Sequence, residues 1–462
     1  MSEAAKTTTS SAVRRGGRRQ TSAMTTTGRS RPPSVAGRPV YIIDGARTPF
    51  LRARGKPGPF TPVDLAVQCG RALLARLPID PESFDLVILG CVNVIADEMN
   101  PARVAALRLG MGEAMRAFTV QINCGSGMQS IDTGFRLIEG GQADLILAGG
   151  AEALSHAPLV LSRKATGWFA RFATAKTAWD RAAALGAFRP DMAKPVIGLE
   201  RGLTDPITDL SMGQTAEIIG HAFGITREAA DAYALESHRR LARAQAEGFL
   251  QSEVIASVAR DGTLYDHDDG VRPDSSMEKL AKLKPAFERP HGRVTPGNSS
   301  QITDGASWVV LASEEAAQKH GLTPIARILD SEWAALDPSV MGLGPTICST
   351  ELMKRRGLGR EDIDLWEINE AFAAQVLACL AAWEDEEYCR EILGLEAPFG
   401  ALDRDRLNVD GGAISLGHPV GSSGNRIVLH LVNAMRRLGL KQGIATECIG
   451  GGQGGAMLLE VM

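Results

Sequence analysis

The stretch QINCGSGMQSIDTGFRLIEGGQADLILAGG, residues 121–150, contains one complete turn–helix–strand unit. Its glycine-rich turn at 124–127 leads into a helix predicted over 129–138, and a strand predicted over 143–147 ends at Gly149-Gly150. Before this stretch the pattern predicts strands at 40–43 and 85–89 and a helix at 101–109. This alternation is typical of an α/β domain whose helices cover a mostly parallel sheet.

The second half of the chain repeats the same order. A glycine-rich turn at 421–424 leads into a helix predicted over 425–437, and a strand at 444–447 ends at a glycine triplet, 450–452. Residues 362–368 likewise echo 83–89. The match lies in the layout rather than in residue identity, and it predicts two duplicated βαβαβ-type domains.

Composition excludes several classes of protein. The 462 residues are 44% hydrophobic and 23% charged, with a formal net charge of −4, so nucleic acid is not the expected main partner. No apolar run approaches the ~20 residues of a membrane-spanning helix. The seven cysteines are scattered, with no pair spaced for zinc or dithiol chemistry. We therefore expect a reduced, cytoplasmic enzyme without a metal site.

The first 38 residues differ from the rest. They are rich in Ser, Thr, Arg and Gly, and Glu3 is their only acid. Such a segment buries too little apolar surface to fold, so we expect a disordered tail. Its composition also resembles a mitochondrial transit peptide, which would change the expected location. The alternative is a solvated or wrongly assigned start, with Met24 as the initiator.

A region of different character, 155–291, separates the two halves. Its stretch 163–181 combines basic and aromatic residues, and a helix follows the predicted cap Thr226. The acidic run 266–270 is not a calcium loop, because the EF-hand register would place Tyr265 and His267 at ligand positions. We interpret that run as a surface turn.

Cys124 is the first candidate for chemistry. A thiol at the start of a helix meets the positive end of the helix dipole and unpaired backbone amides, both of which favour the nucleophilic thiolate. The flanking glycines let a substrate carbonyl come close to the backbone. The alternative for this residue alone is a buried structural cysteine.

Two further motifs strengthen the catalytic interpretation. His418 stands between Gly417 and Pro419, where a rigid backbone suits a general base. Cys448 precedes Gly450, in a run whose backbone N–H groups suit an oxyanion. Since these motifs occupy matching corners of the repeated units, we expect them to share one site.

Four motifs in this order resemble the thiolase superfamily: Cys-x-Ser-Gly at 124–127, Asn-Glu-Ala-Phe at 369–372, Gly-His-Pro-x-Gly at 417–421 and Cys-x-Gly-Gly-Gly at 448–452. The resemblance runs from about residue 39 to the C-terminus. It implies a thiolase-like α/β fold of two duplicated domains with stacked mixed sheets and an inserted loop domain. The implied domains are 39–154 completed by 292–316, the loop domain 155–291 covering CoA, and 317–462.

The resemblance also implies a role for each matching residue. Cys124 would carry the acyl group as a thioester, and His418 would activate Cys124 and help to hold the thioester oxygen. Cys448 would move a proton to and from the α-carbon of acetyl-CoA. Asn369 would fix a water in one oxyanion hole, and the backbone amides of Cys124 and Gly450 would form the other.

The implied ligands are acyl-CoA and CoA, with CoA as a substrate rather than a permanently bound cofactor. Ser300, Gly297 and Arg272 are the candidate CoA contacts. The basic residues at 163–181 would either meet the CoA phosphates or form a solvated helix face. The resemblance further implies a homodimer or homotetramer, with a hydratase/dehydrogenase α-subunit as a possible partner. For the basic and aromatic stretch 163–181, a membrane or a partner subunit is an alternative contact.

The implied reaction is thiolysis of 3-ketoacyl-CoA in fatty-acid β-oxidation. Several stretches resemble the β-subunit of the trifunctional complex, but Asn369 and Val420 depart from that subgroup, which usually has His and an aromatic residue there. The first alternative is therefore a short-chain acetyl-CoA C-acetyltransferase. A non-catalytic acyl-CoA-binding subunit and a Cys–His hydrolase are the others, although neither accounts for Cys448.

Overall fold

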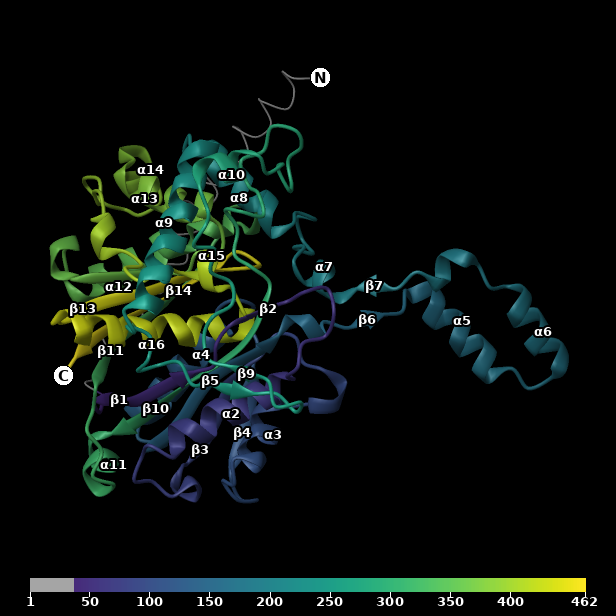
Figure 1. Ribbon diagram of the computed structural model, residues 1–462, viewed down its shortest axis with the longest axis horizontal. Helices are drawn as coiled ribbons and strands as arrows, with labels where there is room; N and C mark the ends of the chain where they lie inside the picture. Colours follow the sequence, from purple (N-terminus) through teal and green to yellow (C-terminus); the bar gives the residue numbers. More distant parts are fainter. Residues whose placement is uncertain (1–36) are drawn as a thin grey trace.

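The computed structural model describes residues 37–462 (Figure 1). The predicted disordered tail therefore lies outside the described residues, apart from Gly37 and Arg38. Arg38 is bonded into the fold, because its guanidinium donates to the carbonyls of Ile138 and Ala143 and pairs with Asp144 at 2.8 Å.

Ten of the described strands form one large sheet in the order β12-β13-β14-β11-β1-β10-β5-β3-β4, with β2 (Leu51–Arg52) added to β10. One half of this sheet contains β1 (Val40–Arg47), β3 (Leu86–Gly90), β4 (Arg116–Val120), β5 (Leu145–Ala153) and β10 (Thr303–Ser313). The other half contains β11 (Ala326–Ala335), β12 (Leu365–Ile368), β13 (Gln442–Ile449) and β14 (Gln453–Val461). A short pairing of β1 with β11 joins the halves.

The two halves have the same topology, as the predicted duplication requires. Outward from the junction, β1-β10-β5-β3 in the first half matches β11-β14-β13-β12 in the second. The helices correspond as well. In the first half they are α2 (Pro62–Leu74), α3 (Pro101–Arg108) and α4 (Ser126–Glu139), and in the second α12 (Gly344–Arg356), α13 (Ala373–Glu384) and α16 (Val420–Leu438).

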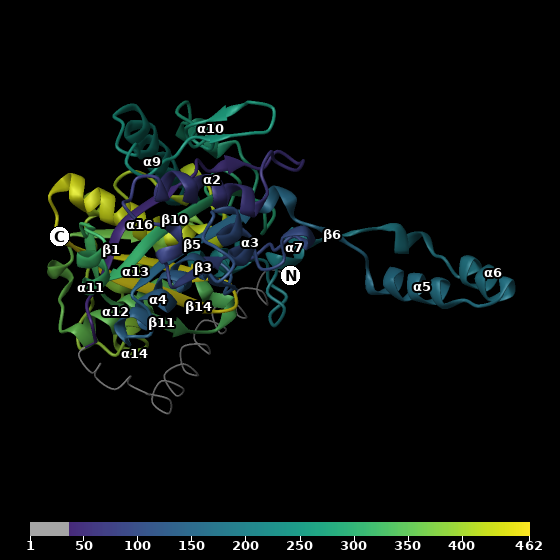
Figure 2. The same cartoon turned by 90° about the horizontal axis from the view of Figure 1, so that it is seen from below.

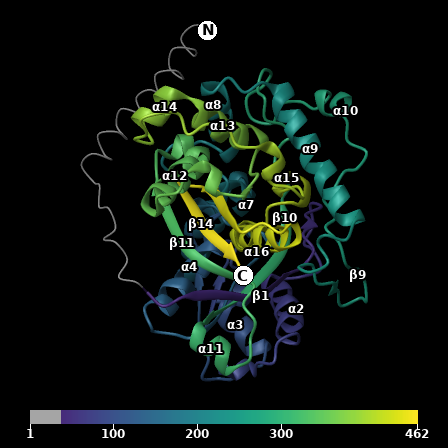
Figure 3. The same cartoon turned by 90° about the vertical axis from the view of Figure 1, so that its left-hand side faces the viewer.

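The halves stack around α4 and α16, which pack against each other in the centre. Figure 3 shows β11 and β14 above these helices, β1 below them, and α2 and α3 on the far side of β1. Because both faces of β5 and β10 are covered, every residue of these two strands is buried. Alternate side chains enter different cores, so that Leu147 faces α2 while Ile146 faces α4 and α16.

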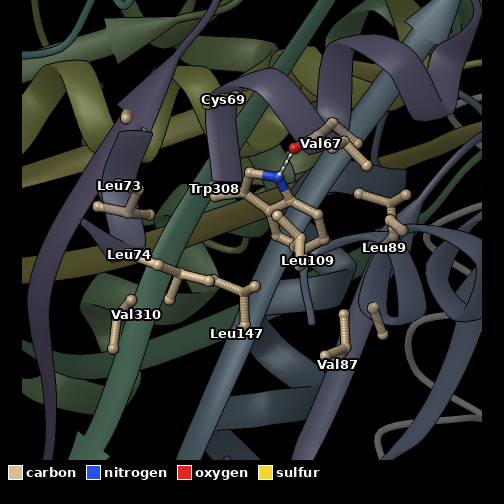
Figure 4. Close-up of a cluster of buried hydrophobic side chains, with 14 of the residues drawn as sticks. Val67, Cys69, Leu73, Leu74, Val87, Leu89, Leu109, Leu147, Trp308 and Val310 are labelled. Carbon is tan, nitrogen blue, oxygen red and sulfur yellow. Dashed lines mark hydrogen bonds between the residues drawn. The ribbon is translucent and has the colours of Figure 1, made fainter. Parts of the chain in front are cut away.

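Figure 4 shows the core beneath α2, where Trp308 lies among Val67, Leu73, Leu109 and Leu147. Its indole N–H donates to the carbonyl of Ala66 at 2.8 Å. A large buried aromatic residue thus has its one polar atom satisfied, which is the condition for burying it at low cost.

The expectation of a mostly parallel sheet is wrong. Only β3–β4, β3–β5 and β12–β13 are parallel pairs, whereas β10 runs antiparallel to both β1 and β5, and β14 runs antiparallel to β11 and β13. The cause is local. The turn at 450–452 sends β14 straight back along β13, and β10 enters the sheet after a long excursion, so neither follows a βαβ crossover.

That excursion, between β5 and β10, contains two parts. One part packs on the body through α8 (Met212–Ala222), α9 (Arg227–Ala246) and α10 (Met277–Ala281), and α9 begins after the predicted cap Thr226. The other part projects away from the body and contains α5 (Arg163–Thr174) and α6 (Ala178–Gly186) (Figures 1 and 2). Two short strands, β6 (Leu159–Val160) and β7 (Val196–Ile197), close its base.

Candidate active site

Cys124 lies in a tight turn between β4 and α4. Asn123 has a left-handed backbone (φ 53°), and its side-chain amide donates to the carbonyl of Gly450 at 2.8 Å. The Ser126 hydroxyl accepts from the N–H of Ile122 at 2.9 Å and donates to the carbonyl of Asn123 at 2.7 Å. These bonds fix Cys124 at the start of α4 and tie its turn to the second half of the chain.

Glycines allow the starts of α4 and α16 to meet. A Cβ on Gly127 would lie 2.6 Å from the backbone nitrogen of Asn425, which is closer than real atoms approach. The absence of that carbon brings the first turns of the two helices into backbone contact. Cys124 precedes one of these turns and His418 precedes the other, so the contact places both residues at the same end of the helix pair.

His418 is held by its backbone and by its ring. Gly417 has φ 109°, and a Cβ there would lie 2.2 Å from the side chain of Thr303, so only glycine fits. The N–H of His418 donates to the carbonyl of Gln301 at 2.9 Å. The ring atom Nδ1 lies 2.6 Å from the Ser423 hydroxyl.

The Ser423 contact assigns the tautomer of His418. Ser423 Oγ donates to the carbonyl of Pro419 at 3.2 Å, so the hydroxyl proton is already used and Oγ accepts from Nδ1–H. The other ring atom, Nε2, has no hydrogen-bond partner in the part of the chain that the structure describes. His418 therefore presents an unprotonated nitrogen, as a general base must.

Asn369 lies just after β12, fully buried. Neither polar atom of its amide bonds to another residue within 37–462. Next to it, Glu370 accepts from Tyr233 at 3.0 Å and Ser237 at 2.7 Å, and Asn408 bonds to both the N–H and the carbonyl of Ile368 at 2.8 and 2.9 Å. The neighbouring side chains have their hydrogen bonds satisfied and fix the backbone around Asn369, while the Asn369 amide itself has no partner within the same described range. This arrangement suits a group that binds water or substrate.

Cys448 and Gly450 come from the end of β13 and the turn after it. Cys448 is fully buried, and Gly451 and Gly452 take left-handed conformations (φ 90° and 80°) that reverse the chain into β14. The carbonyl of Gly450 accepts a hydrogen bond from the side-chain amide of Asn123, so this turn is fixed against the turn that contains Cys124.

These residues meet at one cavity of about 520 Å³. The cavity wall contains Cys124, His418, Cys448, Gly450 and Ser300. Asn369 is not part of this wall, although Ala371 and Phe372, which follow it closely in the chain, are. A volume of this size accommodates a small-molecule ligand.

The two remaining candidate CoA contacts do not line the cavity. Gly297 is enclosed, since a Cβ there would lie 2.5 Å from Leu283 and 2.7 Å from Leu280. Arg272 is exposed on the surface, and its backbone N–H donates to His238 at 3.2 Å.

The expected thiolate is not the state that this site favours. Burial raises the pKa of the Cys124 thiol to about 12, the nearby Glu447 carboxylate adds to the rise, and the amides of Gly450 and Cys124 oppose it. Burial also lowers the pKa of His418 to about 4, aided by Arg426. At neutral pH the free site therefore pairs a neutral thiol with a neutral imidazole. The start of α4 favours the thiolate, but the loss of water around the sulfur at the cavity wall outweighs that effect.

Several features of the site were not foreseen. Segment 198–207 supplies Leu199, Leu203 and Ile207 to the cavity wall. Its sequence carries no catalytic pattern, so only the fold reveals it. Glu447 was also missed, although a carboxylate directly before Cys448 is visible in the sequence. It is fully buried, and neither of its oxygens bonds to any described residue.

Comparisons with known proteins identify the family. Residues 40–315 match the model of the thiolase N-terminal domain, and 322–461 match that of the thiolase C-terminal domain. The mitochondrial trifunctional enzyme subunit beta of Bos taurus is 37% identical over 92% of this chain and 88% of its own length. The beta-ketoadipyl-CoA thiolase of Pseudomonas aeruginosa is 39% identical over 92% of this chain and 99% of its own length.

Solved structures give the same result. Human mitochondrial 3-ketoacyl-CoA thiolase superposes with a TM-score of 0.79 at 36% identity, covering 92% of this chain and 99% of that one. A Bacillus anthracis acetyl-CoA acetyltransferase also gives 0.79, at 35% identity, over 93% and 100%. The fold, the cavity and these relatives together show that the chain belongs to the thiolase family.

Proposed function

We propose that this chain is an acyltransferase that cleaves 3-ketoacyl-CoA with CoA, giving acetyl-CoA and a shortened acyl-CoA. The observation that carries the proposal is the single cavity in which the first half supplies Cys124 and the second half supplies His418 and Cys448. Cleavage needs one group to attack the keto carbon and another to protonate the departing enolate. Two thiols and one base at the same cavity meet that requirement.

In the proposed reaction, Nε2 of His418 removes the proton of the Cys124 thiol as the sulfur attacks the 3-keto carbon. The bond between carbons 2 and 3 breaks, and its electron pair passes to carbon 2. Cys448 protonates that carbon, which releases acetyl-CoA. In the second half, the Cys448 thiolate removes the proton of the CoA thiol as the CoA sulfur attacks the Cys124 thioester. The bond between the acyl carbon and the Cys124 sulfur breaks, the shortened acyl-CoA leaves, and the Cys124 sulfur takes back its proton from His418.

The charge that develops on oxygen is stabilised at two places in this proposal. The backbone N–H groups of Cys124 and Gly450 face the acyl oxygen, and a water held by the Asn369 amide faces the enolate oxygen with His418. The free Asn369 amide supports this assignment, because a buried amide without a partner is costly unless it binds something. Such donors typically contribute about 10²–10³ in rate.

CoA is a substrate in this reaction. A solved relative, human mitochondrial 3-ketoacyl-CoA thiolase, has a structure in complex with CoA. We assign Ser300, on the cavity wall, to the pantetheine arm. The enclosed Gly297 supports the loop that carries Ser300, and Arg272 remains a candidate contact for a CoA phosphate.

Acyl chains longer than acetoacetyl are the substrates we propose. Val92, Leu154, Leu199, Leu203 and Val420 make much of the cavity wall apolar, which favours a hydrocarbon chain. Val420 is the residue that departs from the trifunctional subgroup, and a small side chain there leaves room in the cavity.

A second candidate substrate is a 3-ketoacyl-CoA with a terminal carboxylate. The relatives that are named beta-ketoadipyl-CoA thiolase raise it, and Arg201 on the cavity wall supports it. An arginine can bind such a carboxylate through two hydrogen bonds.

We also propose that the chain forms a homodimer through β4. This strand ends the sheet, none of its residues is fully buried, and Phe118 is 38% exposed. An exposed edge strand invites pairing with another chain, and a second copy of β4 would continue the sheet. A Thr119→Pro variant should be monomeric by sedimentation, whereas a dimer in that variant would contradict this interface.

CoA-dependent thiolysis tests the function. Wild type should cleave 3-ketohexadecanoyl-CoA faster than acetoacetyl-CoA, and Cys124→Ala should cleave neither. Activity mainly on acetoacetyl-CoA would instead assign the short-chain reaction, and activity mainly on 3-ketoadipyl-CoA would assign the carboxylate-bearing substrate. Hydrolysis that does not depend on CoA would indicate a hydrolase, and no Cys124-dependent activity would indicate a non-catalytic subunit.

A further inference from the structure

We propose that the projecting hairpin, residues 159–197, is an arm that docks this protein on the surface of an anionic lipid bilayer. Below, the name "docking arm" refers to these residues: β6, α5, α6 and β7 with their connections. Figures 1 and 2 show α5 and α6 well clear of the body in both views, joined to it only through β6 and β7.

The docking arm has a small core of its own. Trp168 stands at its centre, with ring centroids 5.0 Å from Phe188 and 5.7 Å from Phe172, and its indole N–H donates to the carbonyl of Ala184 at 2.7 Å. These contacts join α5 to α6 and give the arm a defined shape. They do not cover its outer surface.

That outer surface carries large apolar side chains. Trp179 is 83% exposed, Leu185 56% and Phe169 49%, and Leu159 and Leu161 near the base are exposed as well. Single exposed apolar residues are ordinary, but a cluster on one projecting element marks an interaction site. Aromatic residues with a polar atom, such as Trp179, favour the interface between lipid and water.

The charge of the docking arm is opposite to that of the whole chain. It contains seven basic residues (Arg163, Lys164, Arg171, Lys176, Arg181, Arg189 and Lys194) and two acidic ones (Asp180 and Asp191), hence +5, whereas the chain carries −4. Within the described residues, Lys164 is the only one of the seven with an ion pair, to Asp191 at 3.1 Å. The other basic side chains are available to phosphate groups.

Exposed aromatic and basic residues on short helices fit a bilayer surface better than a protein partner. Basic residues attract anionic headgroups while Trp, Phe and Leu enter the acyl boundary. Twelve residues of α5 span roughly 18 Å, less than the ~30 Å hydrocarbon core, and no described helix is long and apolar enough to cross a membrane. The arm therefore lies in the interface.

The position of the docking arm relates it to the active-site cavity. Ala157, two residues before β6, and Gly198, directly after β7, both line the cavity wall. An arm bound to a bilayer would hold the cavity beside the lipid surface, where long acyl chains partition. This last step rests on the proposed function, whereas the lipid binding itself does not.

Vesicle co-sedimentation tests the proposal with the full chain. Wild type should bind vesicles of phosphatidylglycerol and phosphatidylcholine, bind pure phosphatidylcholine weakly, and be released by salt. Reversing three charges (Arg171→Glu, Lys176→Glu and Arg181→Glu) should lower the partition coefficient by roughly a hundredfold. Removing two aromatic residues (Phe169→Ser and Trp179→Ser) should also lower it by at least tenfold.

Matched controls lie elsewhere on the surface. Arg390 is 56% exposed and Leu264 is 58% exposed, so Arg390→Glu and Leu264→Ser repeat the same kinds of change away from the arm and should bind like wild type. Binding that survives both arm variants, or that falls equally in the controls, would overturn the proposal. So would self-association through the arm without vesicle binding, which would assign the surface to a second copy.

The activity of the variants separates this proposal from the proposed function. None of the substituted residues lines the cavity, so every variant should keep wild-type thiolysis of a soluble short substrate. A chain that binds vesicles but has no thiolase activity would refute the function alone. An active chain that ignores anionic vesicles would refute the docking arm alone.

Discussion

Replacing Ser423 with alanine should impair catalysis without an unusual loss of stability. The Ser423 hydroxyl lies 2.6 Å from Nδ1 of His418 and, by our assignment, accepts the Nδ1 proton. Its removal leaves a buried N–H without a partner, at a cost of about 1–3 kcal/mol, and lets the proton move to Nε2, where the base must be free. That energy corresponds to roughly five- to hundredfold in rate.

Ser422→Ala is the matched control. Ser422 precedes Ser423 in the first turn of α16, is equally buried, and bonds to the Ser307 hydroxyl at 3.0 Å rather than to His418. Each substitution removes one buried hydroxyl and its hydrogen bond, so both should lower the free energy of unfolding by a similar amount, about 1–3 kcal/mol.

The assay is kcat/KM for thiolysis across pH, with urea unfolding of the same preparations. Ser423→Ala should lose roughly five- to hundredfold in kcat/KM, whereas Ser422→Ala should stay within about threefold of wild type. Equal rates in the two variants would refute the argument that Ser423 fixes the tautomer of His418.

Three further predictions follow from packing and protonation. Trp308→Phe should lower the free energy of unfolding by about 2–4 kcal/mol, because it leaves a void in the core and removes the hydrogen bond to α2. The control Trp179→Phe, at an exposed site, should change it by less than about 0.5 kcal/mol, and urea unfolding measures both. Gly127→Ala should lower the free energy of unfolding by more than about 3 kcal/mol or prevent folding, since its Cβ would lie 2.6 Å from the backbone nitrogen of Asn425. The control Gly167→Ala in α5 has open space around it, so in the same assay it should be neutral or stabilising by about 0.4–1 kcal/mol. The rate at which iodoacetamide alkylates Cys124, followed by mass spectrometry, should rise with pH up to about 10 without a plateau, because the pKa of the thiol is raised to about 12. A plateau below about pH 8 would reveal a stable thiolate and contradict this prediction.

The pKa of His418 also predicts how stability depends on pH. Its folded-state value of about 4 lies below the unfolded value near 6.5, so between these values the unfolded chain binds more protons. Its contribution to stability is therefore complete above pH 6.5 and is lost as the pH falls toward 4. His430 acts oppositely, since Glu253 helps to raise its pKa to about 9, and its contribution is lost as the pH rises through 9.

Local patterns predicted much of the fold correctly. The glycine-rich segments 124–127 and 421–424 revealed the duplication, since both halves need glycines where the two helices meet. The predicted helix starts were late, because α4 begins at Ser126 and α16 at Val420, so that 421–424 is helical and not a turn. Strand direction was not predictable in the same way. The reversal of β14 depends on the turn at 450–452, and the course of β10 depends on how the excursion after β5 ends.

The candidate site also has a part that could be predicted from local sequence and a part that could not. The motifs of Cys124, His418 and Cys448 contain glycines or a proline that fix the local backbone. It could therefore be predicted that these three residues lie at one site. The contribution of segment 198–207 to the cavity wall and the rise in the pKa of Cys124 depend on what packs around them. Burial is a property of the assembled structure, and short motifs do not encode it.

The central claim is that Cys124 carries the acyl group while Cys448 serves only as the proton donor. The most direct measurement is the intact mass of the protein, with peptide mapping, after mixing with acetyl-CoA alone. We predict one acetyl group on Cys124 in wild type and in Cys448→Ala, and none in Cys124→Ala. An acetyl group on another residue, or an adduct that survives Cys124→Ala, would contradict the account.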